Sequence, residues 1–234
     1  MMILAIDSSG LAATVALQRD DVLVGEFTIH NKKTHSQTIL PMIDEMIRMA
    51  DVDKHEIDYV AVASGPGSFT GLRIGAATAK GLAQALDVPV VPVPTLEGLA
   101  YHYEGAHELV CPLMDARRNQ AYYCVYEAEG ETPKKITDEA AAPIEEIISF
   151  LNQQKRPVLF LGDGVPVFKE QLQKELTVPI RWATDPLRYQ RAGSVAALAR
   201  MYVERGQFIP AKEFAPVYLR LSQAERERRE REHR

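Results

Sequence analysis

Short apolar runs separated by polar turns open the chain. Because Asp, Ser and Gly residues bound these runs, they predict an antiparallel meander of three strands, at residues 3–6, 12–17 and 22–29. Leu40, Ile43 and Ile47 then recur at helical spacing and predict a helix over residues 36–50. The first hundred residues end with a buried strand at 59–63, a glycine-rich loop, a helix to about 86 and a strand at 88–93.

The same order of elements begins again near residue 109. Strands are predicted at 109–114 and 120–126, a helix at 144–151, a strand at 158–161 and a helix at 168–176. The repeat, about a hundred residues long, predicts an α/β fold of two duplicated lobes, each a mixed β-sheet with helices. We expect an N-terminal, partner-binding lobe at 1–100 and a C-terminal lobe at 101–192. A helix and charged tail at 193–234 would be able to pack back on the lobes.

The composition is that of an ordinary globular protein. Hydrophobic residues make up 46% of the chain and charged residues 25%, with a formal net charge of −5. The negative charge argues against a free-standing nucleic-acid binder. No apolar run is long enough to span a bilayer, and the N-terminus lacks the features of a signal peptide. Cys111 and Cys124 are interpreted as buried strand residues, and we expect the protein in the cytoplasm.

The glycine-rich loop, Ser64-Gly-Pro-Gly-Ser-Phe-Thr-Gly71, invites comparison with phosphate-binding loops. Gly71 is followed by Leu72-Arg73 rather than by the Lys-Ser/Thr pair of a Walker motif, and the glycine spacing does not fit a dinucleotide fingerprint. Ser68 is also one position early for a hydrolase nucleophile. Two interpretations remain: an anion held at a helix N-terminus, or glycines that only permit a tight turn.

The helix after the loop carries small residues on nearly every side, and the helix before it has a broad apolar face. Small residues allow close approach, and the apolar face is wider than a single core requires. We therefore expect a partner interface on these two helices, although both could instead be sandwiched inside one domain. The expected interface residues are Leu40, Ile43, Met46, Ile47, Leu72, Arg73, Ala76, Ala79, Lys80 and Ala83.

Candidate catalytic chemistry is sparse. No two of the six histidines have the i, i+4 spacing of a helical metal pair, so no metal site is predicted. Asp7 and Asp115 follow the first strand of each lobe, where they could hold Mg²⁺ near phosphates or simply close a turn. The weak candidate set for a nucleotide or anion is Asp7, Ser8, Gly65, Gly67, Asp115, Arg117, Gly162 and Gly164.

Five stretches together resemble one family. They are Ile3-Leu-Ala-Ile-Asp7-Ser-Ser, Thr34-His-Ser-Gln-Thr-Ile-Leu-Pro-Met-Ile43, Ser64-Gly-Pro-Gly-Ser-Phe-Thr-Gly-Leu-Arg-Ile-Gly75, Met114-Asp-Ala-Arg-Arg and Pro216-Val-Tyr-Leu-Arg220. These motifs resemble the TsaB family, also called YeaZ, over almost the whole chain. The resemblance implies the two-lobed actin-like ATPase fold of the actin, sugar-kinase and Hsp70 group. It also implies a part in tRNA threonylcarbamoyladenosine modification.

The catalytic relative of that family, TsaD, holds a metal with a His-x-x-x-His motif, and Thr95 and Leu99 stand at the matching positions here. Neither is a good metal ligand. The resemblance therefore implies a non-catalytic scaffold or activating subunit that pairs with TsaD, joins TsaE in a larger complex and self-associates as a homodimer. That complex modifies N6 of the adenosine beside the anticodon in tRNAs reading ANN codons.

The resemblance further implies no cofactor required by this chain, weak ATP, ADP or Mg binding at most within the complex, and tRNA contact through the complex. Two alternatives stay open: a self-sufficient ATP-dependent kinase or ATPase, and a metal-dependent peptidase. The tail at residues 223–234 alternates Arg and Glu, which fits either a solvated helix end or an RNA contact.

Overall fold

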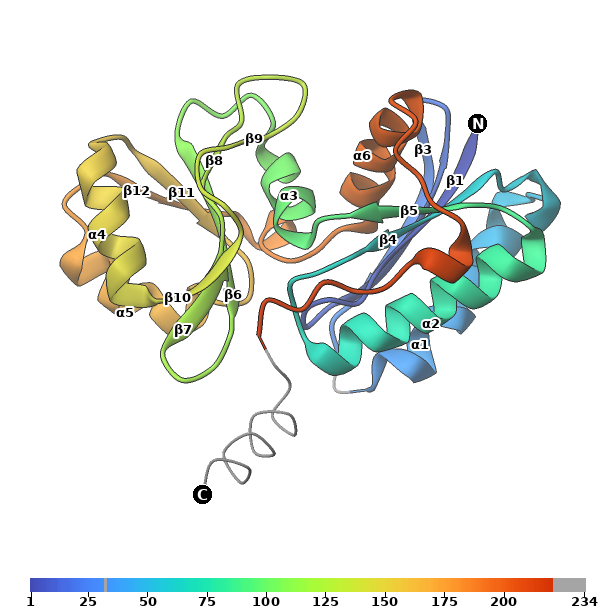
Figure 1. Ribbon diagram of the computed structural model, residues 1–234, viewed down its shortest axis with the longest axis horizontal. Coiled ribbons are helices and arrows are strands. Elements are labelled where there is room, and N and C mark those ends of the chain that lie inside the picture. Colours follow the sequence, from blue (N-terminus) through green and yellow to red (C-terminus); the bar gives the residue numbers. More distant parts are fainter. Residues whose placement is uncertain (32, 221–234) are drawn as a thin grey trace.

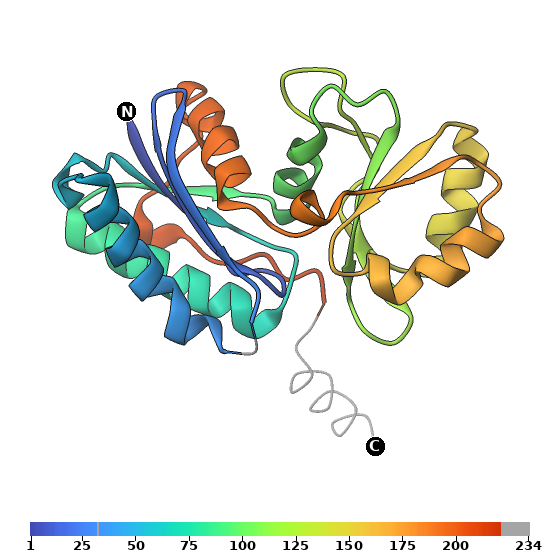
Figure 2. The same cartoon turned by 180° about the vertical axis from the view of Figure 1, so that it is seen from behind.

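The computed structural model describes residues 1–31 and 33–220. The chain folds into two lobes that lie side by side, each with its own β-sheet (Figures 1 and 2). The predicted α/β fold of two duplicated lobes is therefore confirmed. The Arg/Glu tail at 223–234 lies outside the described residues.

The N-terminal lobe contains a five-stranded sheet in the order β3-β2-β1-β4-β5. Its first three strands form the predicted antiparallel meander, whereas β4 and β5 run parallel to β1. The apolar residues of β1 follow one another without interruption and are buried on both faces of the sheet, as expected for the central strand of a covered sheet. The strands are β1 (Met2–Asp7), β2 (Ala13–Arg19), β3 (Val22–Ile29), β4 (Tyr59–Ala63) and β5 (Val90–Val93).

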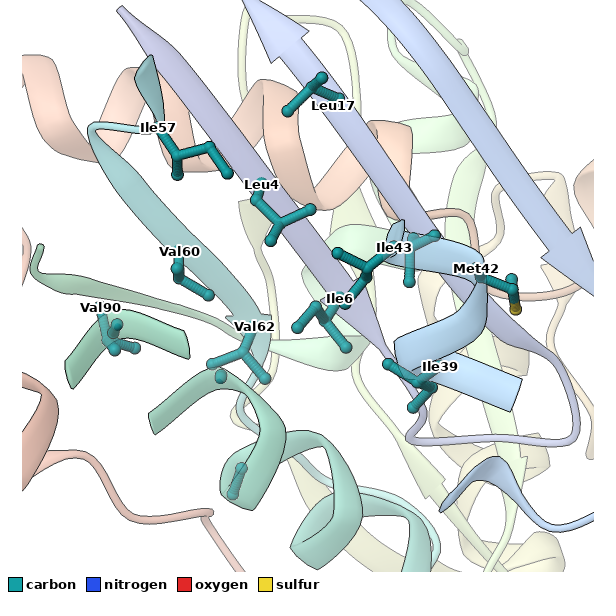
Figure 3. Close-up of a cluster of buried hydrophobic side chains, with 14 of the residues drawn as sticks. Leu4, Ile6, Leu17, Ile39, Met42, Ile43, Ile57, Val60, Val62 and Val90 are labelled. Carbon is teal, nitrogen blue, oxygen red and sulfur yellow. The ribbon is translucent and has the colours of Figure 1, made fainter. Parts of the chain in front are cut away.

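Helices cover both faces of this sheet. On one face lie α1 (His35–Ala50) and α2 (Phe69–Leu86), side by side, and α6 (Ala192–Glu204) lies on the other (Figures 1 and 2). Figure 3 shows the core under α1, where Leu4 and Ile6 of β1 and Val60 and Val62 of β4 belong to the same buried cluster as Ile43 of the helix. The opposite face packs Ile3 and Ala5 against α6.

The sheet of the C-terminal lobe repeats the same order, as β10-β7-β6-β11-β12. The central strand β6 pairs antiparallel with β7 at one end and with β8 at the other, so the second strand of the repeat is interrupted. Two short pieces, β8 and β9, extend the sheet beside it. The strands are β6 (Leu109–Asp115), β7 (Gln120–Tyr123), β8 (Tyr126–Glu127), β9 (Lys134–Lys135), β10 (Ala140–Pro143), β11 (Val158–Leu161) and β12 (Ile180–Trp182).

The helix that ends each repeat crosses to the other lobe. One face of the second sheet packs on α4 (Ile144–Gln154) and α5 (Val165–Glu175), within its own repeat. The other face packs on α3 (Thr95–Ala100), which follows β5 of the first sheet, whereas α6 follows β12 and packs on the first sheet. The two lobes are thus joined by an exchange of helices (Figure 1).

Short 3-10 helices complete the fold: η1 (Lys54–Glu56), η2 (Tyr101–Tyr103), η3 (Asp185–Leu187) and η4 (Ala211–Glu213). The expected lobe limits near residues 100 and 192 fall beside the two exchanged helices. Residues 95–100 pack with the C-terminal lobe and residues 192–204 with the N-terminal lobe.

Candidate functional site

A cleft of about 960 Å³ lies between the lobes. Both sheets contribute the residues at the ends of their first strands, and the glycine-rich loop contributes the N-terminus of α2. The last described residues of the chain also line it. The polar and charged lining residues are Asn31, Lys33, His35, Ser68, Thr70, Asp115, Arg117, Asp163 and Arg220.

Asp7 ends β1 beneath this cleft and is 2% exposed. Burial raises the pKa of its carboxyl to about 6, although hydrogen bonds from Ser9 act in the opposite direction. The Ser9 amide and hydroxyl both donate to the Asp7 Oδ1 atom, at 2.8 and 2.6 Å. The side chain therefore closes its own turn, which is the local hydrogen bonding that favours Asp at such positions.

Asp115 does the same in the other lobe. Its Oδ1 atom accepts the Arg117 amide at 2.7 Å, and its Oδ2 atom lies 3.2 Å from the Arg117 guanidinium. Its own amide donates to the Oδ1 atom of Asp163 at 3.1 Å. Burial, and secondarily the charge of Asp115, raises the pKa of Asp163 to about 6.

The cleft thus mixes carboxylates with cations. Lys33, Arg117 and Arg220 line it together with Asp115 and Asp163, and Arg117 pairs with Asp115. The described part of the chain contains no group of three or more His, Cys, Asp or Glu side chains placed to hold a metal ion. The arrangement can bind a polar or anionic group, but each carboxyl near it already accepts hydrogen bonds from its own chain.

The glycine-rich loop owes its bare backbone to the turn after β1. A Cβ atom on Gly67 would lie 2.4 Å from the Ser9 carbonyl oxygen, and one on Gly71 would lie 2.0 Å from that of Ser8. A Cβ atom on Gly75 would meet the Ser8 hydroxyl at 2.4 Å. The loop and the start of α2 therefore press directly on the β1–β2 turn, and close packing within this chain accounts for these glycines.

The structure brings only some of the eight weak candidates for nucleotide or anion binding to the cleft. Gly67, Asp115 and Arg117 line the cleft. Asp7 and Ser8 lie buried beside it, at 2% and 3% exposure. The other three glycines pack on backbone carbonyl groups instead: Gly65 on Val217, and Gly162 and Gly164 on Leu113.

Six of the ten residues expected at a partner interface are buried inside the N-terminal lobe. They form part of its core, so these side chains cannot contact another chain, and this corrects the expectation for them: Ile43, Met46, Leu72, Ala76, Ala79 and Ala83. Leu40 is 52% exposed, Arg73 is exposed and Ile47 is half-buried. Lys80 is occupied by this chain, because its Nζ atom donates to the carbonyl groups of Lys212 and Phe214.

The positions matched to the metal ligands of the catalytic relative are buried in helix α3. Thr95 is 1% exposed, and its hydroxyl accepts the Gly65 amide at 3.2 Å while its own amide donates to the Gly65 carbonyl group at 2.9 Å. Leu99 is also 1% exposed and packs in the core of the C-terminal lobe. Both positions thus have structural contacts.

Three residues at or near the boundary between the lobes were not predicted from the sequence, and of these Asp163 lines the cleft. Asp163 stands between two glycines of a predicted turn, and that setting was its one available signal. Gln190, 1% exposed, bridges the lobes by lying against Gly10 and donating to the Met114 sulfur at 3.8 Å; nothing in the sequence marks it. Burial lowers the pKa of His102 to about 4, and its Nδ1 atom lies 3.1 Å from the Leu187 carbonyl oxygen.

These features define the class of protein. Two lobes with the same strand order, exchanged terminal helices and a cleft between the ends of their first strands constitute the two-lobed actin-like ATPase fold. The sequence matches the tRNA N6-adenosine threonylcarbamoyltransferase family, TsaD, over residues 23–228.

The chain belongs to the TsaB family, also called YeaZ. It is 32% identical to the tRNA threonylcarbamoyladenosine biosynthesis protein TsaB of Bacillus subtilis, over 96% of each chain. It is also 32% identical to the TsaB of Haemophilus influenzae, over 94% of each chain. The solved structure of YeaZ from Pseudomonas aeruginosa superposes with a TM-score of 0.77 at 28% identity, covering 93% of this chain and 99% of that one.

Within residues 1–31 and 33–220, none of the helices combines the length and apolar content that a membrane crossing requires.

Proposed function

We propose that this protein is a non-catalytic subunit of the machinery that makes threonylcarbamoyladenosine in tRNA. Membership of the TsaB family supports the pathway. The lack of catalysis is supported by one observation above all: Thr95 and Leu99 are core residues of α3 and offer no metal ligands to the cleft. The carboxyls of Asp7 and Asp115 close their own turns, which further supports a binding role.

The proposed partner is the threonylcarbamoyl transferase TsaD, and the proposed surface is the solvent side of α1 and α2. Leu40 and Met49 of α1 are 52% and 66% exposed, a large exposure for apolar side chains. On α2 the exposed residues Ala77, Gly81 and Ala85 form a slim surface that another helix can approach closely. The same surface would support a homodimer when the transferase is absent.

The remaining parts of the proposal concern ligands. This chain requires no cofactor of its own, and any ATP, ADP or Mg acts within the complex, which also contains TsaE. Contact with tRNA occurs through that complex and alters the adenosine beside the anticodon in tRNAs reading ANN codons.

The test is complementation in cells depleted of this chain, with tRNA nucleosides measured by mass spectrometry. Depletion should remove threonylcarbamoyladenosine, and the wild-type chain should restore it. Ala77→Glu should fail to restore it, because it places a charge on the slim surface without entering the core. The matched control is Gln173→Glu, on the exposed side of α5 in the other lobe, which should restore the modification fully.

Two results would contradict the proposal. Persistence of the modified nucleoside after depletion would contradict a role in this pathway. Full activity of Ala77→Glu would contradict the partner surface on α1 and α2. Turnover of ATP by the purified chain alone would favour the alternative, a self-sufficient kinase or ATPase of the same fold.

A further inference from the structure

The segment between η4 and the last described residue crosses the molecule without forming a helix or a strand. From Phe214 it runs along α2 and reaches the space between the lobes, on the side of α2 rather than of α3 and α6 (Figures 1 and 2). Its final residues line the interlobe cleft. We name residues 214–220 the strap.

The N-terminal lobe holds the strap at several points. Phe214 is 3% exposed and belongs to the core beneath α1 and α2. The Lys80 Nζ atom donates to the Phe214 carbonyl group at 2.9 Å, and the Val217 amide donates to the Ser64 carbonyl group at 2.7 Å. The Tyr218 ring lies 4.6 Å from the Phe69 ring, at the first residue of α2.

The glycine-rich loop is shaped to receive the strap. A Cβ atom on Gly65 would lie 2.3 Å from the Val217 carbonyl oxygen. Gly65 also has φ +116°, a conformation that residues with a side chain rarely adopt. Any other residue at this position would displace the strap, so the loop and the strap fit each other as two parts of one structure.

The far end of the strap contacts the other lobe. Arg220 donates to the carbonyl group of Ala116 and, at 3.5 Å, to that of Arg117, in the turn that follows β6. In this turn Arg117, Arg118 and Asn119 all have positive φ, at 64°, 55° and 57°. Such conformations persist where neighbouring contacts hold them, and the Arg220 guanidinium provides such a contact.

We propose that the strap is an interlobe tie that sets the separation of the two lobes. It is anchored on α2 and the glycine-rich loop, and Arg220 fastens its end to the turn of the C-terminal lobe. The hydrogen bonds of a guanidinium to carbonyl groups are charge-assisted and so stronger than neutral ones. Release of Arg220 opens the cleft, and the same release frees the part of the cleft that Val217, Tyr218 and Arg220 now line.

The test measures the distance between the lobes in the purified full-length chain. Spin labels are placed on Gln84→Cys of α2 and Gln173→Cys of α5, both exposed, while the native Cys111 and Cys124 are buried. Electron–electron double resonance then compares Arg220→Ala with the parent. We expect the distance distribution of Arg220→Ala to broaden and to shift to longer distances.

The matched control is Arg118→Ala, which also removes one positive charge, from the turn that Arg220 contacts, but leaves both hydrogen bonds of Arg220 in place. Its distribution should equal that of the parent. A second variant, Tyr218→Ala, loosens the strap at its other anchor and should broaden the distribution as well. In both strap variants, the amide exchange of Val217 should rise about tenfold, because Arg220→Ala loses hydrogen bonds and Tyr218→Ala loses the ring contact with Phe69.

An unchanged distance distribution in Arg220→Ala and Tyr218→Ala would overturn the proposal. Circular dichroism establishes whether each variant is folded. If Arg220→Ala does not fold, the distance distribution of Tyr218→Ala alone tests the proposal. The measurement uses this chain alone, with labelled chain diluted in an excess of unlabelled chain so that only distances within one copy are detected. Its outcome is therefore independent of any partner or of tRNA modification.

Discussion

The helix pair α1–α2 of the N-terminal lobe and the pair α4–α5 of the C-terminal lobe follow the third and fourth strands of equivalent sheets, yet they differ in length and surface. The first pair has 16 and 18 residues, and the second has 11 and 11. The solvent side of α5 carries charged residues such as Lys169, Glu170 and Lys174, whereas that of α2 carries Ala77, Gly81 and Ala85. The two equivalent helices thus differ in their exposed residues, which are charged on one side of α5 and small at these positions of α2, where we propose the partner surface.

The glycine turns after the fourth strands show a second difference. Gly65 and Gly162 both have positive φ, at 116° and 97°, and at both a Cβ atom would strike a backbone carbonyl oxygen. In the C-terminal lobe that oxygen belongs to Leu113, in the sheet of the same lobe. In the N-terminal lobe it belongs to Val217 of the strap, so the same turn has been used to bind a distant segment.

The largest change in the free energy of unfolding is expected between substitutions on the buried and the exposed side of α1. Ile43 is 3% exposed, and Ile43→Glu buries a charge in the core, which should cost about 4 kcal/mol or more of unfolding free energy. Leu40→Glu, at a 52% exposed position, should change it by less than about 0.5 kcal/mol. Urea denaturation of the two variants measures both values. Equal stability of the two variants would contradict the burial of Ile43.

A smaller loss is expected at the contact between α2 and the β1–β2 turn. The Cβ atom of Gly71→Ala would lie 2.0 Å from the Ser8 carbonyl oxygen, and backbone cannot yield as a flexible side chain does. We expect a loss of about 3 kcal/mol, the upper part of the range for overpacking. Thermal and urea unfolding provide the measurement, and a variant as stable as the parent would show that the turn is free to move.

The free energy of unfolding should depend on pH through the partly buried Asp163 carboxyl of the cleft, whose pKa differs between the folded and the unfolded chain. The pKa of Asp163 is about 6 in the folded chain against 3.8 in the unfolded chain, so the folded state binds the extra proton between these values. Its contribution is therefore present at pH 4 and is lost as pH rises through 6. Asp163→Asn should raise the unfolding free energy at pH 7.5 by about 2–3 kcal/mol and change it little at pH 4.

The control for this prediction is Asp21→Asn, at an exposed position. His102 acts in the opposite direction, because its pKa of about 4 in the folded chain lies below 6.5 and its contribution is lost as pH falls through that interval. The difference between variant and parent at each pH removes this common background. A difference that does not change with pH would contradict the raised pKa of Asp163.

The order of elements was predictable because its signals are local. Short apolar runs bounded by turn residues, the helical spacing of Leu40, Ile43 and Ile47, and turns closed by Asp7 and Asp115 each depend on residues close in sequence. The repetition of these signals sufficed for the duplicated lobes.

The partner of each buried face was not predictable in the same way. The small residues of α2 indicate close approach, but Ala76, Ala79 and Ala83 approach the sheet of their own lobe, and the pattern cannot say which neighbour is meant. The sequence predicted that the helix after residue 193 could pack back on the lobes, but not on which sheet, and it did not predict the packing of α3 on the second sheet, since an apolar helix face is equally suited to either sheet. The raised pKa of Asp163 depends on its burial in the folded chain, which no local pattern encodes.

A buried and an exposed ion pair should differ in their contributions to the free energy of unfolding, by less than the core substitutions above. Glu26 of β3 has a side chain 7% exposed, pairs with Arg191 at the start of α6 and accepts the Gly193 amide at 2.9 Å. Glu26→Ala removes the counter-charge of Arg191 and the acceptor of the Gly193 amide, and it should cost about 2 kcal/mol of unfolding free energy. Glu127→Ala breaks a pair with Arg156 that is 36–38% exposed and should cost less than about 1 kcal/mol. Urea denaturation at low and high salt separates them, and equal losses would contradict the difference in burial.

The smallest change in the free energy of unfolding is expected at Gly81, on the exposed side of α2, whose first turn is tightly packed. A Cβ atom on Gly81 meets nothing within 4 Å, whereas one on Gly71 meets backbone. Gly81→Ala removes the conformational cost of a glycine inside a helix, so it should stabilise the chain by about 0.5–1 kcal/mol. Thermal unfolding measures the gain, and a loss would show that the backbone at this position already meets a neighbour. Because the effect of one added methyl group on stability changes sign between Gly71 and Gly81, the pair distinguishes the side of α2 that packs on its own lobe from the side that faces solvent.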